Sequence, residues 1–133
     1  MTNSLSPNFF LVGSARCGTT SLFYYLRQHP DIVFSKIKEP KYFGSLAQEY
    51  PHRGPGDSTV DSLVVREIDA YRELFLGLQA ARRIGDASSD TLYFHRHTAD
   101  QIYAELGDIP IIVMFIKCPD QITHIIQHLY GYM

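Results

Sequence analysis

Short runs of consecutive apolar residues alternate along the chain with longer segments in which apolar residues recur every three or four positions. The first pattern is typical of strands buried on both faces, and the second of amphipathic helices. The runs predict strands over residues 8–12, 32–34 and 111–116, and residues 83–86 look like a strand end that leads into a loop. The periodic segments predict helices over residues 19–28, 62–78 and 98–106. Strands that alternate with helices predict an α/β fold built on a parallel sheet.

Local signals set the ends of these elements. Thr19 suits the start of the first helix, and Pro30 stands just beyond its end. Thr98 is the expected N-cap of the last helix, and Gly107 is its expected C-terminal stop. Residues 44–59 contain prolines and glycines among polar residues, so we expect a surface loop there. The strand over 111–116, with six apolar residues in a row, is the one that we expect to be most clearly buried.

The composition narrows the class of protein. The chain has 133 residues, of which 45% are hydrophobic and 20% charged, and its formal net charge is −2. These values suit one globular domain over residues 1–133, and they argue against a broad nucleic-acid interface. No apolar run reaches the length of a membrane span, and the first residues lack the features of a signal peptide. Cys17 and Cys118 are too few for a disulfide framework, so a cytoplasmic location is expected.

The segment after the first strand carries the strongest chemical signal. Gly13 and Gly18 flank four residues, and a helix pattern begins directly afterwards. Glycines at this spacing let backbone N–H groups point inward, and the helix adds the positive end of its dipole. A nucleoside-triphosphatase loop would carry lysine after the second glycine, but this chain has Thr19 there and a basic residue, Arg16, inside the loop. The segment therefore predicts an anion-binding loop of a different kind.

The order Gly-x-x-Arg-x-Gly-Thr-Thr, followed by Lys38-Glu39-Pro40, resembles segments of the sulfotransferases that use 3′-phosphoadenosine 5′-phosphosulfate (PAPS), in particular the bacterial and heparan-sulfate types. The likeness runs from about residue 8 to 93 and resumes imperfectly at 111–119. It implies a P-loop-type parallel sheet flanked by helices, PAPS as the sulfuryl donor and no metal. It also implies a set of donor-binding residues, namely Gly13, Ser14, Ala15, Arg16, Cys17, Gly18, Thr19, Thr20 and Lys117.

The same resemblance implies roles in catalysis or acceptor binding for five positions, one of which, Arg16, also belongs to the donor-binding set. Arg16 would bind the 5′-phosphosulfate and stabilise charge on the bridging oxygen, Lys38 would offset charge on the leaving phosphate, and Glu39 would remove the acceptor proton. Residues 85–93 resemble a Gly-Glu-x-Ser-Pro-x-Tyr segment that lines the acceptor cleft, so Asp86 and Ser88 would contact the acceptor, with Asp86 as a second candidate base. Each position also has a purely structural alternative: a solvated turn for Arg16, a charged helix start for Lys38 and Glu39, and a polar capping loop around Asp86.

The chain departs from the resemblance near its C-terminus. Family members follow the last of these strands with Arg-Asn-Pro-x-x-Arg-Ala-x-Ser, in which the first arginine and the serine bind the 3′-phosphate. This chain has Lys117, Ile122 and Ile125 at the positions of the two arginines and the serine, and it is about half the usual length. Lysine keeps the charge but lacks the two-pronged grip of arginine. A C-terminally shortened member with weakened donor binding is therefore expected, and an uncovered sheet edge would favour a homo-oligomer.

Three functions stay open from the sequence. The first is sulfuryl transfer from PAPS to a hydroxyl or amine of a small-molecule or carbohydrate acceptor. The second is a magnesium-dependent P-loop nucleotide kinase or hydrolase, against which the missing lysine and acidic metal ligand argue. The third is a non-catalytic nucleotide-binding fragment. A metal centre is not expected, because His95 with His97 and His124 with His128 lack further ligands at suitable spacing.

Overall fold

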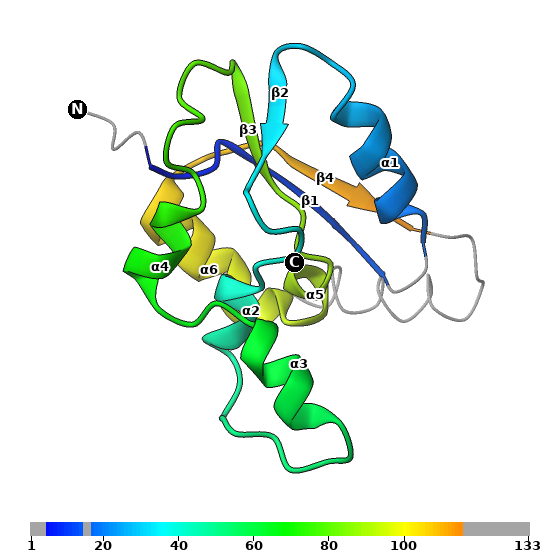
Figure 1. The fold of residues 1–133 in the computed structure, drawn as a ribbon, viewed down its shortest axis with the longest axis vertical. Helices are drawn as coiled ribbons and strands as arrows, with labels where there is room; N and C mark the ends of the chain where they lie inside the picture. Colours follow the sequence, from blue (N-terminus) through cyan, green and yellow to red (C-terminus); the bar gives the residue numbers. More distant parts are fainter. Residues whose placement is uncertain (1–4, 15–16, 116–133) are drawn as a thin grey trace, which may run out of the picture.

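A computed structural model describes residues 5–14 and 17–115 of the chain, and its sheet is parallel throughout the described strands (Figure 1). The strands are β1 (Phe9–Gly13), β2 (Ile32–Phe34), β3 (Arg83–Asp86) and β4 (Ile111–Met114). They lie in the order β2-β3-β1-β4, so β1 is internal and every connection crosses over a face of the sheet. The predicted α/β fold with a parallel sheet is confirmed.

The described helices cover both faces of this sheet. They are α1 (Thr19–Leu26), α2 (Tyr42–Ser45), α3 (Asp57–Leu63), α4 (Ile68–Glu73), α5 (Asp90–Tyr93) and α6 (His95–Leu106). Figure 1 shows α1 on one side of the sheet and α4 and α6 on the other, while α3 projects away and buries none of its residues. Each helix within the described ranges is too short or too polar to cross a bilayer.

Alternation along β1 separates the core into two parts. All five residues of β1 are buried, because helices cover the sheet on both sides. Phe9 and Leu11 belong to the cluster under α1, where they meet Phe23 and Phe34. Phe10 and Val12 point to the opposite face and join a cluster of residues from α2, α4, β3 and α6, namely Tyr42, Phe43, Tyr71, Phe75, Ile84 and Ile102. The continuous apolar run in the sequence is thus explained by burial on both faces.

Aromatic rings dominate the second cluster. The rings of Tyr42 and Tyr71 stack with centroids 4.7 Å apart, and Phe75 meets Tyr71 edge-on at 5.1 Å. Phe43 bridges to β1 through Phe10, with ring centroids 5.7 Å apart. Such pairs add about 0.5–1.5 kcal/mol each beyond the area they bury. They attach α2 and α4 to the sheet, and this places the segment before α2 across the carboxyl ends of the strands.

Two predicted segments have different bounds in the structure. The single helix expected over 62–78 is wrong, because α3 ends at Leu63 and α4 begins at Ile68. The residues between them have an extended backbone, and the N–H of Val65 donates a hydrogen bond to the carbonyl of Pro40 at 3.0 Å. The loop expected over 44–59 is also too long at both ends. Its start belongs to the buried helix α2, and its end, from Asp57, belongs to α3.

The last helix and the last strand also correct the predictions. Helix α6 begins at His95, and Thr98 lies inside it with its hydroxyl donating to the carbonyl of Thr91 at 2.8 Å, so Thr98 is not the N-cap. Gly107, with φ 79°, ends the helix as predicted. Strand β4 runs over Ile111–Met114 rather than to residue 116, and its first three residues are 37–47% exposed instead of buried. It is an edge strand that pairs with β1 alone among the described strands.

Gly85 should be a point at which the core tolerates no added atom. A Cβ there would lie 2.5 Å from Cζ of Phe9 and 2.7 Å from Cε1 of Phe34. We expect Gly85→Ala to lower the free energy of unfolding by about 1–3 kcal/mol through overpacking. Urea denaturation followed by circular dichroism measures this change, with Ala99→Ser on the exposed side of α6 as the control. A Gly85→Ala variant as stable as the unsubstituted chain would contradict the packing described.

Candidate active site

The loop after β1 turns back closely over the end of its own strand. A Cβ on Gly13 would lie 2.5 Å from Sγ of Cys17, 2.7 Å from the carbonyl oxygen of Met114 and 2.8 Å from Cγ2 of Thr19. The amide of Ser14 donates to the Met114 carbonyl at 3.3 Å, and the amide of Cys17 donates to the Ser14 carbonyl at 3.2 Å. Only glycine fits at position 13, because the returning loop occupies the space of a side chain.

The loop then enters α1 through a second glycine. Gly18 has φ 88°, a left-handed conformation that L side chains rarely adopt, and α1 begins at the next residue. The first-turn amides of Thr19 and Thr20 have no intrahelical carbonyl to bind, and the first turn contains no acidic residue. The helix start therefore favours an anion. Ala15 and Arg16, predicted for the same loop, lie outside the described residues.

Lys38 reaches this helix start from a segment 18 residues further along the chain. Its Nζ donates to Oγ1 of Thr20 at 3.2 Å and lies 5.6 Å from the ring centroid of Phe23. The ring supports the ammonium through a cation–π contact while the hydroxyl fixes its direction. The structure thus brings together the loop and the lysine that the sequence predicted as partners in binding a phosphate. Lys117, the remaining predicted donor-binding residue, lies outside the described residues.

Glu39 follows Lys38 in an unusual backbone turn. Glu39 and Lys41 have φ 56° and 60°, left-handed values that are uncommon for residues other than glycine, and Pro40 between them is fully buried. The side chain of Glu39 points to the loop after β3, where its Oε1 accepts a hydrogen bond from Oγ of Ser89 at 2.9 Å. Glu39 therefore lies where the segment before α2 meets that loop.

Asp86 and Ser88, which the resemblance predicts to contact the acceptor, are both buried in the structure. Each is only 1% exposed. The Asp86 carboxylate accepts hydrogen bonds from Tyr71 Oη and Ser88 Oγ, both at 2.6 Å, and Ser88 Oγ accepts one from the Lys41 amide at 3.0 Å. Burial raises the pKa of Asp86 to about 6, although the hydrogen bonds from Ser88 and Tyr71 act in the opposite direction. In the described conformation both side chains belong to the core.

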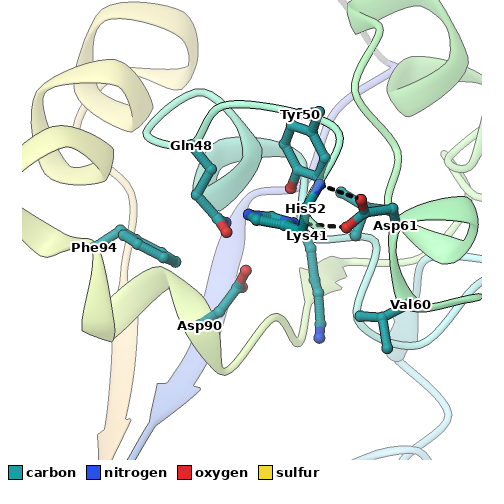
Figure 2. Close-up of a pocket in the computed structure, with 9 residues that line it drawn as sticks. Lys41, Gln48, Tyr50, His52, Val60, Asp61, Asp90 and Phe94 are labelled. Carbon is teal, nitrogen blue, oxygen red and sulfur yellow. Dashed lines mark hydrogen bonds and ion pairs between the residues drawn. The ribbon is translucent and has the colours of Figure 1, made fainter. Parts of the chain in front are cut away.

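A cavity of about 170 Å³ lies on the other side of Lys41 (Figure 2). Its lining combines polar and aromatic side chains: Lys41, Gln48, Tyr50, His52, Val60, Asp61, Val64, Asp90 and Phe94. Three of them, Gln48, Tyr50 and His52, come from the segment between α2 and α3, which the sequence marked only as a loop. Nothing in the spacing of these residues indicated a shared site, because the packing of α3 and α5 brings them together.

Within this cavity, His52 is held by Asp61. The His52 Nδ1 lies 2.6 Å from Asp61 Oδ1, and the His52 amide donates to Asp61 Oδ2 at 2.8 Å. Because a carboxylate only accepts, this contact places a hydrogen on Nδ1. The hydrogen bonds from His52 lower the pKa of Asp61. The pair orients the imidazole ring in the cavity, as Figure 2 shows.

Asp90 is the least satisfied group of the cavity. Its Oδ1 is buried without a hydrogen-bond partner, and its carboxylate packs directly on Gly44. Burial raises the pKa of Asp90 to about 6, with Lys41 acting in the opposite direction and Asp86 adding to the increase. Figure 2 shows the Asp90 carboxylate and the Gln48 amide pointing toward each other across the cavity. A ligand with a hydroxyl or amine hydrogen would satisfy the Asp90 oxygen.

Among the described residues, no group of three or more histidine, cysteine, aspartate or glutamate side chains is arranged to hold a metal ion. His124, His128 and Cys118 lie outside the described residues. The structure instead brings together the N-terminus of α1, Lys38, Glu39 and the polar cavity. Together they suit the binding and transfer of an anionic group.

Comparisons with known proteins agree with this arrangement. The crystal structure of a sulfotransferase from Alicyclobacillus acidocaldarius is similar with a TM-score of 0.75 and 40% identity, over 81% of this chain and 43% of that one. Carbohydrate sulfotransferase 15 from Rattus norvegicus is 34% identical and that from Homo sapiens 33% identical, over 65% of this chain. Membrane-associated sulfotransferase kil1 from Dictyostelium discoideum is 49% identical over 39 residues.

The chain is thus similar in sequence and in fold to sulfotransferases, as its loop and Lys-Glu-Pro motifs predicted. No family model matches the chain. The chain spans 18% of the length of the two carbohydrate sulfotransferases and 43% of the length of the bacterial structure. The activity of a whole sulfotransferase is therefore a matter for proposal.

The buried charge of Asp90 should make stability depend on pH. Its pKa is raised from 3.8 to about 6, so the folded state binds the proton more tightly than the unfolded state. This destabilisation is absent below pH 4, grows between pH 4 and 6 and is complete above pH 6. We expect Asp90→Asn to raise the free energy of unfolding by about 1–2 kcal/mol at pH 7.5, after allowance for partial exposure.

Urea denaturation at pH 4 and pH 7.5 measures this difference. Asp100→Asn on the exposed side of α6 is the matched control and should not show the same pH dependence. An Asp90→Asn variant that is destabilised more at pH 7.5 than at pH 4 would contradict the prediction, because the ionised carboxylate would then have a partner in the fold.

Proposed function

We propose that the chain is a sulfotransferase domain that binds PAPS at the loop over residues 13–20 and transfers its sulfuryl group to a hydroxyl or amine. The observation that carries this proposal is the contact between Lys38 Nζ and Thr20 Oγ1 at 3.2 Å. It unites two motifs that are separate in the sequence, and it places a cation beside a helix start that favours anions. The similarity of the chain to sulfotransferases supports the same reaction.

The proposed chemistry is a direct, in-line transfer. The acceptor oxygen or nitrogen forms a bond to sulfur while the bond between sulfur and the bridging phosphate oxygen breaks. Glu39 takes the proton of the acceptor, and Lys38 offsets the negative charge that develops on the leaving phosphate. The products are a sulfated acceptor and adenosine 3′,5′-bisphosphate. Arg16 is proposed to bind the phosphosulfate from inside the loop, and no metal ion is required.

The polar cavity supports a hydroxylated acceptor. It begins at Lys41, two residues after Glu39, and it includes Asp90, the neighbour of the Ser89 that binds Glu39. Carboxylate and amide groups beside the ring of Phe94 suit a ligand that has hydroxyl groups and an apolar face. Two of the relatives are named carbohydrate sulfotransferases, which supports a sugar as the acceptor. A cavity of about 170 Å³ suits a single ring better than a long chain.

Donor binding is tested first with adenosine 3′,5′-bisphosphate by isothermal titration calorimetry. We expect Lys38→Ala to weaken binding about tenfold to a hundredfold, the usual effect of losing a charge-assisted hydrogen bond, and Arg16→Ala to abolish measurable binding. Lys36→Ala is the matched control, because the Lys36 ammonium lies against the Glu73 carbonyl at 3.4 Å and should leave affinity unchanged. Equal affinities for all variants would show that the loop does not bind the donor. Tight binding of magnesium–ATP in place of the bisphosphate would favour a kinase.

Catalysis is tested by transfer of ³⁵S from PAPS to methyl glycosides of glucose and galactose, glucosamine and p-nitrophenol. We expect Glu39→Gln to lower kcat by about 10²–10⁴, the usual loss for a general base, while the affinity for adenosine 3′,5′-bisphosphate stays the same. Glu49→Gln, an exposed position after α2, is the control. A Glu39→Gln variant as active as the unsubstituted chain would refute the base. An unsubstituted chain that binds the bisphosphate but transfers nothing would favour a non-catalytic nucleotide-binding role.

A further inference from the structure

We propose that Asp86 is a positioning residue for Glu39: through the hydroxyl of Ser88 it fixes the backbone of Lys41, and with it the left-handed turn on which Glu39 stands. The inference rests on the proposed function, in which Glu39 removes the acceptor proton. It gives Asp86 and Ser88 a role that is compatible with their burial.

The chemistry of the groups sets the direction of every hydrogen bond in this network. The Lys41 amide can only donate, so Ser88 Oγ must accept from it at 3.0 Å. The single hydrogen of the Ser88 hydroxyl is then directed to Asp86 Oδ1 at 2.6 Å. Tyr71 Oη donates to Asp86 Oδ2, also at 2.6 Å. A carboxylate that accepts from both sides thus orients the serine so that its lone pair faces the Lys41 amide.

The turn that this network holds needs such support. Left-handed φ values at Glu39 and Lys41 cost roughly 1–3 kcal/mol each, and they persist only where the surroundings determine them. Lys41 is held through its amide by Ser88, and its carbonyl accepts from the Ser45 amide at 3.0 Å. The carbonyl of Pro40 accepts from the Val65 amide at 3.0 Å. Each backbone group therefore ties the turn to a different part of the fold.

Two adjacent serines connect the network to the proposed base. Ser88 holds the backbone at Lys41, while Ser89 donates to the Glu39 carboxylate at 2.9 Å. The loop after β3 therefore sets both the path of the turn and the direction of the Glu39 side chain. Asp86, at the end of β3, anchors that loop. A shift of the loop would move the base relative to the helix start that Lys38 contacts, and displacements of about 1 Å can lower rates about a hundredfold.

The protein retains a buried charge here although burial disfavours it. The pKa of Asp86 is raised to about 6, so the carboxylate is ionised at neutral pH and accepts from both hydroxyls. The charged or titratable groups that bear on it are Tyr71 of α4 and Glu39 before α2, while Asp86 in turn raises the pKa of Asp90 at the start of α5. An apolar residue would pack in the same space without directing Ser88. The buried carboxylate therefore lowers the stability of the fold, but it fixes the orientation of the Ser88 hydroxyl.

The decisive comparison is Ser88→Ala against Thr91→Val. Both remove a buried hydroxyl from the same stretch of chain, but Thr91 Oγ1 has no hydrogen-bond partner, whereas Ser88 Oγ links Asp86 to Lys41. We expect Ser88→Ala to speed hydrogen exchange of the Lys41 amide at least tenfold, measured by NMR. We also expect it to lower kcat for ³⁵S transfer from PAPS about tenfold to a hundredfold, with KM for PAPS and the affinity for adenosine 3′,5′-bisphosphate within twofold. Thr91→Val should leave all four quantities unchanged.

The outcomes separate this inference from the proposed function. Unchanged exchange at Lys41 in Ser88→Ala, or a kcat equal to that of Thr91→Val, overturns the positioning role. A parallel loss of bisphosphate affinity also overturns it, because the effect would then be a general disturbance of the site. Faster exchange at Lys41 in a chain that has no transfer activity before substitution would refute the proposed function but leave the link between Ser88 and the turn established.

Discussion

The burial of β1 on both faces is the constraint on which the rest of the structure depends. Phe9 and Leu11 need the cover of α1, and Phe10 and Val12 need the cluster formed with α2, α4 and α6. A strand with this pattern must be internal, and its parallel neighbours bring their carboxyl ends to the same edge of the sheet. The loops after β1 and β3 therefore leave the sheet at the same edge. The segment before α2 contacts the start of α1 through Lys38 and the loop after β3 through Glu39.

Unfavourable conformations and buried charges gather at this edge of the sheet. Glu39 and Lys41 are non-glycine residues in left-handed conformation, and Asp86 and Asp90, with raised pKa values, flank the two serines that bind this turn. Elsewhere in the fold, aromatic packing supplies stability that can offset these costs. Such a concentration of strain and buried charge is typical of sites that must hold side chains in one arrangement.

The strands and the tight turn after β1 could be predicted because their signals are local. An apolar run before Gly13, and glycines at a spacing that only a tight turn explains, do not depend on distant residues. The break between α3 and α4 could not be predicted, because the helical pattern there yields to a hydrogen bond between Val65 and Pro40, residues 25 positions apart. The cavity around His52 and Asp90 escaped prediction for the same reason, since separate elements contribute its lining.

The sequence by itself determined the parallel α/β fold and the position of the loop, because periodicity and glycine spacing are properties of short segments. The association of Lys38 with that loop followed from the resemblance to sulfotransferases, and the structure brings Lys38 to Thr20. Only the tertiary structure decided that Asp86 is buried and that its partners are Tyr71 and Ser88. The exposure of a polar residue at a strand end depends on what packs over it, and that is set by contacts distant along the chain.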